Sequence, residues 1–289
     1  MKKFKNIKLM LLGLLALGSV NAFADDYVYV NNLVYKVVDA TEKTVNFYGL
    51  SEKYTADWDT YELIIPATIS ASAPGTGATT TYTVVGMDGS YGDAQSTGTD
   101  WGTQAIAAYI QKMQVNFALK TNEARTLAWA PVNYSTFTAL KEFTIGDARM
   151  TAKLPSLNAS LKTRLEKINV AGVSNDKDPV AVPDNWADGF SALKSVTLPD
   201  ADGLTIGKNA FRGTAITAID LKKTTSIGEK AFQGAPIAVI TIPETVESIG
   251  SGAFWSMTET TTIAFNSGKM TTVPNVFSDL AKVTKISIA

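Results

Sequence analysis

The sequence predicts a mainly β protein whose C-terminal half is a solenoid of short repeats, preceded by a β-rich region. One observation is a hexapeptide of the form Ile-Gly-x-x-Ala-Phe, which occurs at 206–211, 227–232 and 249–254. The other is a triplet of apolar residues, spaced i, i+3 and i+5, that recurs between these hexapeptides. A period in the low twenties with one strand per repeat is typical of a solenoid, in which each repeat buries its apolar face against its neighbours.

Residues 1–24 have the pattern of a secretory signal peptide. A lysine-rich start is followed by an apolar run from Met10 to Leu17 and by Ala22-Phe23-Ala24, which fits a small-x-small cleavage site. The alternative is a transmembrane anchor, but the apolar run is shorter than the ~20 residues that a spanning helix needs. We therefore expect a protein that does not span a membrane. It would be secreted or held at the cell surface, with the periplasm as the other possibility.

The composition excludes several classes of site. The chain has no cysteine and no histidine, so it lacks disulfides, Ser-His-Asp and Cys-His catalytic systems, and His/Cys zinc sites. Without the four lysines of the leader, 22 basic residues face 27 acidic ones. This balance has the wrong sign for a nucleic-acid-binding surface. We expect no cofactor, no metal site and no enzymatic activity.

The region 25–135 is predicted to be a β-rich cap. Two strands, 27–30 and 33–38, flank Asn31-Asn32 and should form a hairpin, because asparagine tolerates the positive φ of a tight turn. Apolar residues at helical spacing favour a helix over about 103–117. Further strands are expected at 44–48, 61–65 and 79–85, and loops at 70–78 and 88–103.

The region 136–289 is predicted to hold seven repeats, each with one strand. In every repeat the triplet should point inward and the phenylalanine of the hexapeptide should fill the opposite side of the core. The glycine after isoleucine is expected to adopt a backbone shape that a side chain would hinder. Residues 171–188 form an insertion, and in this repeat Trp186, or else Phe190, takes the place of the phenylalanine. The triplets begin at Leu140, Leu165, Leu193, Ile216, Ile237, Thr260 and Val283.

The hexapeptide, followed by a strand such as Ile237-x-x-Ile-x-Ile-Pro243, resembles the BspA-like leucine-rich repeats of exported bacterial proteins. The resemblance covers 193–254 most closely and weakens on both sides. Thr214 and Ala235 stand near the place where the family often has cysteine. The resemblance implies a right-handed leucine-rich repeat solenoid and a binding or adhesive role at the cell surface. It supplies no catalytic residues.

The candidate binding face is the column of outward strand residues between the two inner positions of each triplet. In leucine-rich repeats this column lies on the concave face, where partners dock. Thr197, Asp220 and Thr241 are its central members, and Trp255, next to Phe254, is a possible exposed anchor. The alternatives are a plain solvated β-face for the column and packing against the next repeat for Trp255. The column runs through Thr144, Asn169, Thr197, Asp220, Thr241, Ala264 and Ser287.

Three functions remain open at this point. The first is an exported, non-catalytic protein that recognises an extracellular protein or glycan, on host matrix or on other cells. The second is a structural or assembly subunit of the envelope, whose partner is another copy or another envelope protein. In the last repeat, Val283, Ile286 and Ile288 either stack on such a partner or are covered by residues 277–282. The third is a carboxylate-based glycosidase. Four aspartates in 171–188 are expected to form a solvated acidic loop rather than a calcium site, because their spacing does not match a calcium loop.

Overall fold

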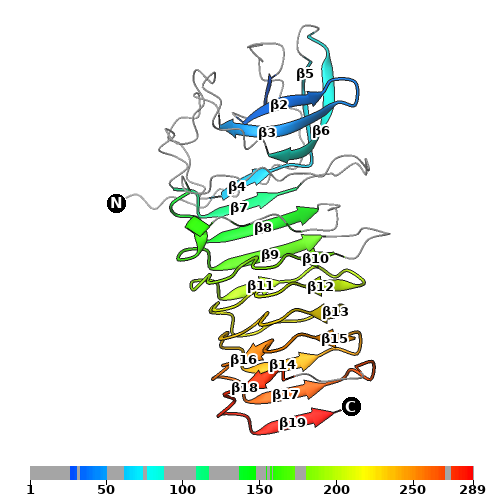
Figure 1. Cartoon of the computed structure of the whole chain (residues 1–289). Coiled ribbons are helices and arrows are strands. Elements are labelled where there is room, and N and C mark those ends of the chain that lie inside the picture. Colours follow the sequence, from blue (N-terminus) through cyan, green and yellow to red (C-terminus); the bar gives the residue numbers. More distant parts are fainter. Residues whose placement is uncertain are drawn as a thin grey trace, which may run out of the picture. The chain divides into compact units, whose positions relative to one another are not determined.

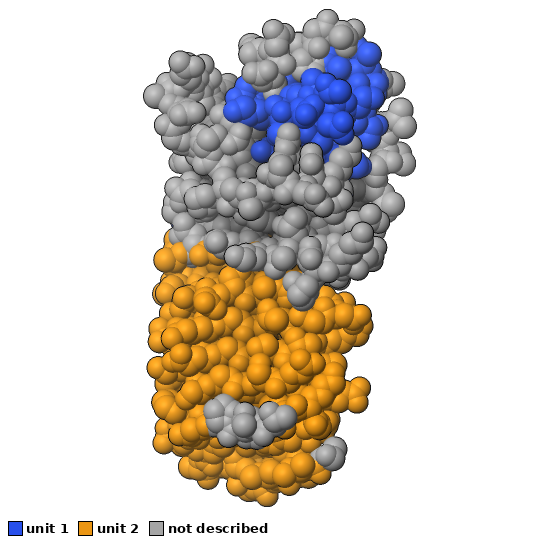
Figure 2. Space-filling model, turned by 45° about the vertical axis from the view of Figure 1, so that its right-hand side comes forward, with its two compact units in different colours: residues 1–140 blue, residues 141–289 orange. Residues whose placement is uncertain are grey.

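The computed structural model describes residues 27–30, 33–50, 62–73, 77–87, 109–116, 137–147, 154, 157, 159–172, 180–270 and 275–288. The chain divides into two compact units, residues 1–140 and 141–289, which are coloured separately in Figure 2. The described residues are mainly β, and they include a short 3₁₀ turn, η3, at Ala159–Leu161. No helix within these ranges has the length and hydropathy needed to cross a membrane.

The first unit contains a five-stranded sheet in the order β1-β2-β3-β6-β5. The predicted hairpin is confirmed, since β1 and β2 pair antiparallel from Tyr27↔Lys36 to Val30↔Leu33. The two edge strands, β1 and β5, approach each other, so the sheet is curved around its core of buried residues such as Tyr35 and Phe47. The strands are β1 (Tyr27–Val30), β2 (Leu33–Asp39), β3 (Thr44–Leu50), β5 (Thr68–Ser72) and β6 (Thr79–Met87).

Two sequence predictions in the first unit are wrong. Residues 70–72, expected in a loop, belong to β5, whose Ile69 and Ala71 alternate inward opposite β6. The helix expected over about 103–117 is contradicted at residues 112–115, which form β7 (Lys112–Val115). Residues 103–108 lie outside the described part. Met113 and Val115 are buried while Lys112 is exposed, and this alternation of period two is that of a strand.

Strand β7 also shows that the repeat pattern begins earlier than the sequence predicts. Ile110, Met113 and Val115 have the i, i+3, i+5 spacing of the triplets, and all three are buried. Strand β4 (Glu62–Ile65) pairs with β7 in parallel, with Leu63 opposite Met113 and Ile65 opposite Val115. The long insertion between β4 and β7 hides this period in the sequence.

In the second unit, six of the seven predicted triplets form strands, which Figure 1 shows stacked side by side. On one face they make two parallel groups: β8-β9-β11 and β14-β17-β19. Pairing is in register, so inner residues stack on inner residues, as with Ile240, Ile263 and Ile286. The strands are β8 (Glu142–Asp147), β9 (Lys167–Gly172), β11 (Ser195–Thr197), β14 (Val239–Ile242), β17 (Thr262–Phe265) and β19 (Lys285–Ile288).

A second parallel sheet runs through the hexapeptides in the order β10-β12-β13-β15, and a short pair, β16-β18, follows the last of them. Val182, Ile206, Ile227 and Ile249 are in register across this sheet. The first residue of each hexapeptide, an isoleucine, therefore lies on a strand of this sheet. The strands are β10 (Ala181–Val182), β12 (Leu204–Ile206), β13 (Thr224–Ile227), β15 (Ser248–Ile249), β16 (Phe254–Trp255) and β18 (Phe277–Ser278).

The phenylalanines of the hexapeptides form a continuous stack in the core. The ring centroids of Phe211 and Phe232 lie 5.3 Å apart, and those of Phe232 and Phe254 lie 5.6 Å apart with nearly parallel planes. Phe277 extends the stack beyond Phe254. Trp186 meets Phe211 edge-on, although the backbone of Ala187, not of Trp186, occupies the register of Phe211. Offset stacking at these distances is a favourable arrangement for aromatic rings.

The glycines of the hexapeptides have a different role from the expected one. Gly207, Gly228 and Gly250 lack a positive φ, so backbone shape does not require them. A Cβ on Gly228 would instead lie 2.5 Å from the backbone of Gly207 and Lys208 in the preceding repeat. The left-handed backbone falls two residues later, at Asn185, Asn209, Lys230 and Gly252. The glycine is needed because neighbouring repeats make direct backbone contact there.

Candidate functional site

The structure separates the predicted column into two strand-borne parts with a gap between them. Thr197 lies on β11, in register with Asn169 and Thr144, and Thr241 lies on β14, in register with Ala264 and Ser287. Both threonines are exposed. The column therefore faces outward as expected. Its middle member, Asp220, lies on no strand, because residues 216–221 form no ladder.

Local hydrogen bonds explain why the repeat containing Asp220 departs from a strand. The Asp220 carboxylate accepts the backbone N–H of Lys222 through Oδ1 at 2.9 Å, and Lys222 has a φ of 52°. The chain then turns at once, with the N–H of Thr224 donating to the carbonyl of Leu221 at 3.0 Å. An aspartate that bonds to a nearby N–H offers the backbone an alternative to the ladder. The repeat therefore turns where its neighbours remain extended.

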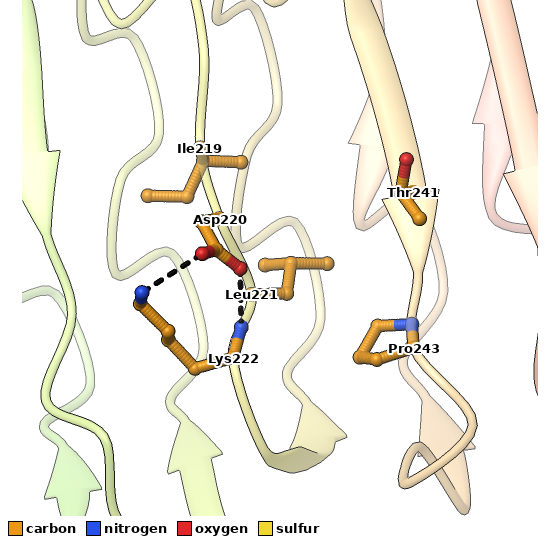
Figure 3. A pocket seen from close by; sticks show the side chains of 6 residues that line it. All are labelled: Ile219, Asp220, Leu221, Lys222, Thr241 and Pro243. Atoms are coloured by element: carbon orange, nitrogen blue, oxygen red, sulfur yellow. Dashed lines mark hydrogen bonds and ion pairs between the residues drawn. The ribbon is translucent and has the colours of Figure 1, made fainter.

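The departure leaves a hollow of about 340 Å³ between this repeat and β14, which we call the Asp220 hollow (Figure 3). Two predicted face residues, Asp220 and Thr241, line it. Ile219 is half-buried there, although the sequence predicts that it points into the core like Ile240. The lining residues are Ile219, Asp220, Leu221, Lys222, Thr241 and Pro243.

The charges in the hollow are paired within the protein. Lys222 Nζ lies 2.9 Å from Asp220 Oδ2, and this bond raises the pKa of Lys222 and lowers the pKa of Asp220. The backbone N–H of Lys222 lowers the pKa of Asp220 further. Lys223 next to it contacts Asp202 at 2.9 Å and Asp200 at 3.5 Å. At neutral pH the hollow therefore presents a fixed ion pair beside apolar walls, without an unpaired charge.

Trp255 is not the exposed anchor that one sequence hypothesis proposes. Its side chain is half-buried, and its indole covers Gly252, where a Cβ would lie 2.9 Å from the ring. The backbone of Trp255 pairs with Ser278 in the next repeat. This geometry agrees with the alternative of packing. Trp255 is not among the residues that line the Asp220 hollow.

The acidic segment 171–188 is partly built into the repeats. Asp188 makes two hydrogen bonds of 2.8 Å with the guanidinium of Arg212, and Asp184 accepts the backbone N–H of Lys208 at 2.7 Å. Asp176 and Asp178 lie outside the described residues. Within the described ranges no group of three acidic residues is placed to hold a metal ion. The two described aspartates hold the repeat that begins at β10 against the next one.

Sequence reasoning missed Lys222, Pro243 and Ile219 as residues of the site. The sequence holds no signal that singles these residues out. Leu198 and Ile242 are each followed by proline, which ends a strand, whereas Leu221 is followed by Lys222. The triplets of β8, β9 and β17 also lack this proline and still form strands, so its absence does not mark the repeat that leaves the common pattern.

The last strand of the array forms a second exposed feature. All four residues of β19 are exposed, including Ile286 at 65% and Ile288 at 81%. Ile263, the in-register partner of Ile286 on β17, is only 2% exposed, and Phe265, the partner of Ile288, is half-buried. Strand β19 is the edge of the β14-β17-β19 sheet. An apolar edge strand of this kind can pair with another chain.

Comparison with known proteins identifies the repeats. Residues 188–289 match the BspA type leucine rich repeat region in six copies. This part of the chain is therefore a BspA-type leucine-rich repeat region, as its hexapeptides indicate. A search of curated proteins finds no match.

Three solved structures show low similarity over most of the chain. They are a leucine rich cell surface protein from Faecalibacterium prausnitzii, a leucine-rich repeat protein from Bacteroides ovatus and the pneumococcal vaccine antigen PcpA. The first is 14% identical with a TM-score of 0.35, and the alignment covers 91% of this chain and 94% of that one. The second is 14% identical with a TM-score of 0.31, and the alignment covers 90% of this chain and 78% of that one. The third is 13% identical with a TM-score of 0.27, and the alignment covers 92% of this chain and 88% of that one.

Proposed function

We propose that this protein is an exported, non-catalytic binding protein that recognises an extracellular protein or glycan through its repeat region. The observation that carries the proposal is the Asp220 hollow, which opens between the repeat of Asp220 and the outward residue Thr241 on β14. The hollow combines apolar walls with hydrogen-bonding groups, a composition suited to recognition. The lack of histidine and cysteine in the sequence is in keeping with a binding role.

The proposal includes an architecture and a location. Residues 141–289 form one right-handed solenoid, in which the parallel strands and the phenylalanine stack run through successive repeats. Residues 1–24 act as a signal peptide, so the mature protein is secreted or displayed on the cell surface. The parallel register of β8-β9-β11 and β14-β17-β19 supports the first statement, and the lysine-rich start with its apolar run supports the second. Its partners are proteins or glycans of host matrix or of other cells.

Binding is tested with an array of extracellular-matrix proteins and glycans, probed with the purified mature protein. We expect saturable binding that decreases when Thr241, on the rim of the hollow, is changed to Lys. Thr262→Lys, on the neighbouring strand β17, is the matched control. Absence of binding on this array would refute the proposed function.

Protease treatment of intact cells tests the location, because a surface protein is cleaved while a periplasmic one is protected.

A second function, assembly with a copy of itself, is favoured by the exposed β19. In a two-fold contact the same strand from each copy would cover Ile286 and Ile288 of the other. Sedimentation over a range of concentrations tests this function. We expect a dimer that is lost in the double variant Ile286→Glu, Ile288→Glu, whose substitutions fall on exposed side chains. A protein that stays monomeric at every concentration would exclude self-association.

A further inference from the structure

The Asp220 hollow lies beside an unpaired strand edge. Strand β14 ends the β14-β17-β19 sheet, and β11 ends its own group, so the face is interrupted between them. The last backbone bond before the gap joins the N–H of Ala238 to the carbonyl of Thr217 at 3.1 Å. Within the described residues, 218–221 pair with no strand. The main-chain groups on this edge of β14 are therefore available to another backbone.

The interruption is confined to one face of the repeats. On the other face β12, β13 and β15 pair continuously through the same repeats. The phenylalanine stack also continues, with Phe211, Phe232 and Phe254 at regular spacing. The repeats are thus held together elsewhere while the hollow stays open. An opening braced in this way is preformed, and binding to it does not require the repeats to separate.

The dimensions and lining of the hollow select an extended backbone. The hollow has a volume of about 340 Å³, and the four residues of β14 offer an edge about 13 Å long. Val239, which is 50% exposed, shares the outward face of β14 with Thr241. Leu221 and Pro243 add apolar surface to the lining. No aromatic ring lines the hollow, so it lacks the platform on which a planar or ring-shaped ligand would stack.

We propose that the Asp220 hollow binds about four residues of an extended, uncharged stretch of a partner polypeptide, which pairs with the free edge of β14. This inference rests on the proposed binding function and specifies its ligand. Main-chain hydrogen bonds supply affinity in such strand addition, and alternate side chains supply specificity. Because Asp220 and Lys222 neutralise each other, the hollow favours neutral side chains. One apolar side chain of the guest contacts Val239 and Ile219.

Asp220 controls whether the hollow exists. Its carboxylate holds the turn at Lys222, whereas the corresponding residues Thr197 and Thr241 lie on strands. The variant Asp220→Thr removes the acceptor that competes with the ladder and introduces a residue with high β propensity. We expect 218–221 to pair with β14 in this variant. The protein's own backbone would then occupy the edge that the partner uses.

The test is a selection of randomised nine-residue peptides on the purified protein. We expect the selected peptides to slow hydrogen exchange at 239–242 and to lose at least tenfold in affinity on Asp220→Thr. Lys223→Ala, which removes a charge outside the lining, should retain full affinity. A proline scan of one selected peptide needs no variant of the protein. Proline should abolish binding at alternate positions, whose N–H groups point at β14.

Four outcomes overturn the inference. They are the recovery of no peptide with a Kd below about 1 mM, protection at other strands only, unchanged affinity in a folded Asp220→Thr protein, and indifference to the proline scan. Binding on the matrix or glycan arrays without protection at β14 overturns this inference alone. Absence of binding on the array refutes the proposed function, on which this inference rests.

Discussion

Asn209 donates a hydrogen bond from Nδ2 to Oδ1 of Asn185 at 3.0 Å, which links the same position of two neighbouring repeats. Asn209 is only 8% exposed, and its own Oδ1 has no partner among the described residues. The next repeat places Lys230 at this position, with a φ of 55°. The ladder of asparagines therefore stops at Asn209 with one acceptor unsatisfied.

We predict that Lys230→Asn stabilises the protein by about 1 kcal/mol. Asparagine adopts a left-handed backbone more readily than lysine, and its Nδ2 can donate to the free Oδ1 of Asn209. The ion pair that is lost, between Lys230 and Glu229 at 3.5 Å, is exposed and contributes little. Denaturant unfolding measures the change. Lys230→Gly is the matched control, since glycine also accommodates the positive φ but supplies no side-chain amide. Equal stability of the two variants would show that no stabilising hydrogen bond forms to Asn209 Oδ1.

We predict that Gly250→Ala destabilises the repeat region by roughly 1–3 kcal/mol, because the new methyl group overlaps the backbone of Glu229 and Gly228. Gly268→Ala is the control, since a Cβ at Gly268 meets nothing within 4 Å and φ there is not positive. This control should change stability by less than ~1 kcal/mol. Thermal unfolding of both variants provides the measurement. Similar midpoints would show that the repeats are not in backbone contact at Gly250.

The phenylalanine stack predicts a large difference between adjacent residues. Phe232 is fully buried between Phe211 and Phe254, so Phe232→Ala should cost about 3–5 kcal/mol. Gln233 is half-buried and outside the stack, so Gln233→Ala should cost less than ~1 kcal/mol. Denaturant midpoints compare the two. Comparable midpoints would contradict the placement of Phe232 in the core.

Glu166 provides a prediction about pH. Its carboxylate bridges Lys194 at 2.9 Å and Lys141 at 3.6 Å, and the hydrogen bond from Lys194, with help from Lys141, lowers its pKa. Since the pKa is lower in the folded protein, the unfolded chain binds more protons in this range. The stabilisation is then complete above the unfolded value of about 4.3 and is lost as the pH falls through the folded pKa.

Wild type should therefore be more stable than Glu166→Gln at pH 7. This gap, the difference between their free energies of unfolding, should close as the pH falls below about 4. It should also narrow in 1 M salt, because both partners are exposed. Unfolding at a series of pH values measures the gap. Glu244→Gln, at an exposed glutamate, is the control. A gap that is independent of pH would mean that the bridge does not stabilise the fold.

The repeats could be predicted from sequence because each triplet meets an identical environment in its neighbours. Six triplets form strands, and the exception at Ile216 follows from one local bond that hydrophobic spacing does not encode. Asp220 is polar and outward in either conformation, so its preference for the N–H of Lys222 leaves the pattern unchanged. The hollow therefore cannot be predicted from the periodicity of the hydrophobic residues.

The first unit was harder to predict, for a different physical reason. Ile106, Ile110, Met113 and Phe117 satisfy helical spacing, while Ile110, Met113 and Val115 also satisfy the triplet. The pairing of β7 with β4 decides between them, and 46 residues separate Ile65 from Lys112. Trp255 illustrates the same limit at the candidate site, since the contact of its ring with Gly252 is tertiary.

The backbone contact at the hexapeptide glycines has a consequence for how such a chain can change length. Gly228 contacts the backbone at Gly207, and Gly250 contacts the backbone at Gly228. Each repeat therefore makes the same kind of contact with the repeat before it and with the repeat after it. A tandem duplication of one period, such as residues 207–227, would add a module that fits both neighbours without a new interface. Expansion and contraction of the gene in steps of one period would then preserve the core, while substitutions at these glycines would not.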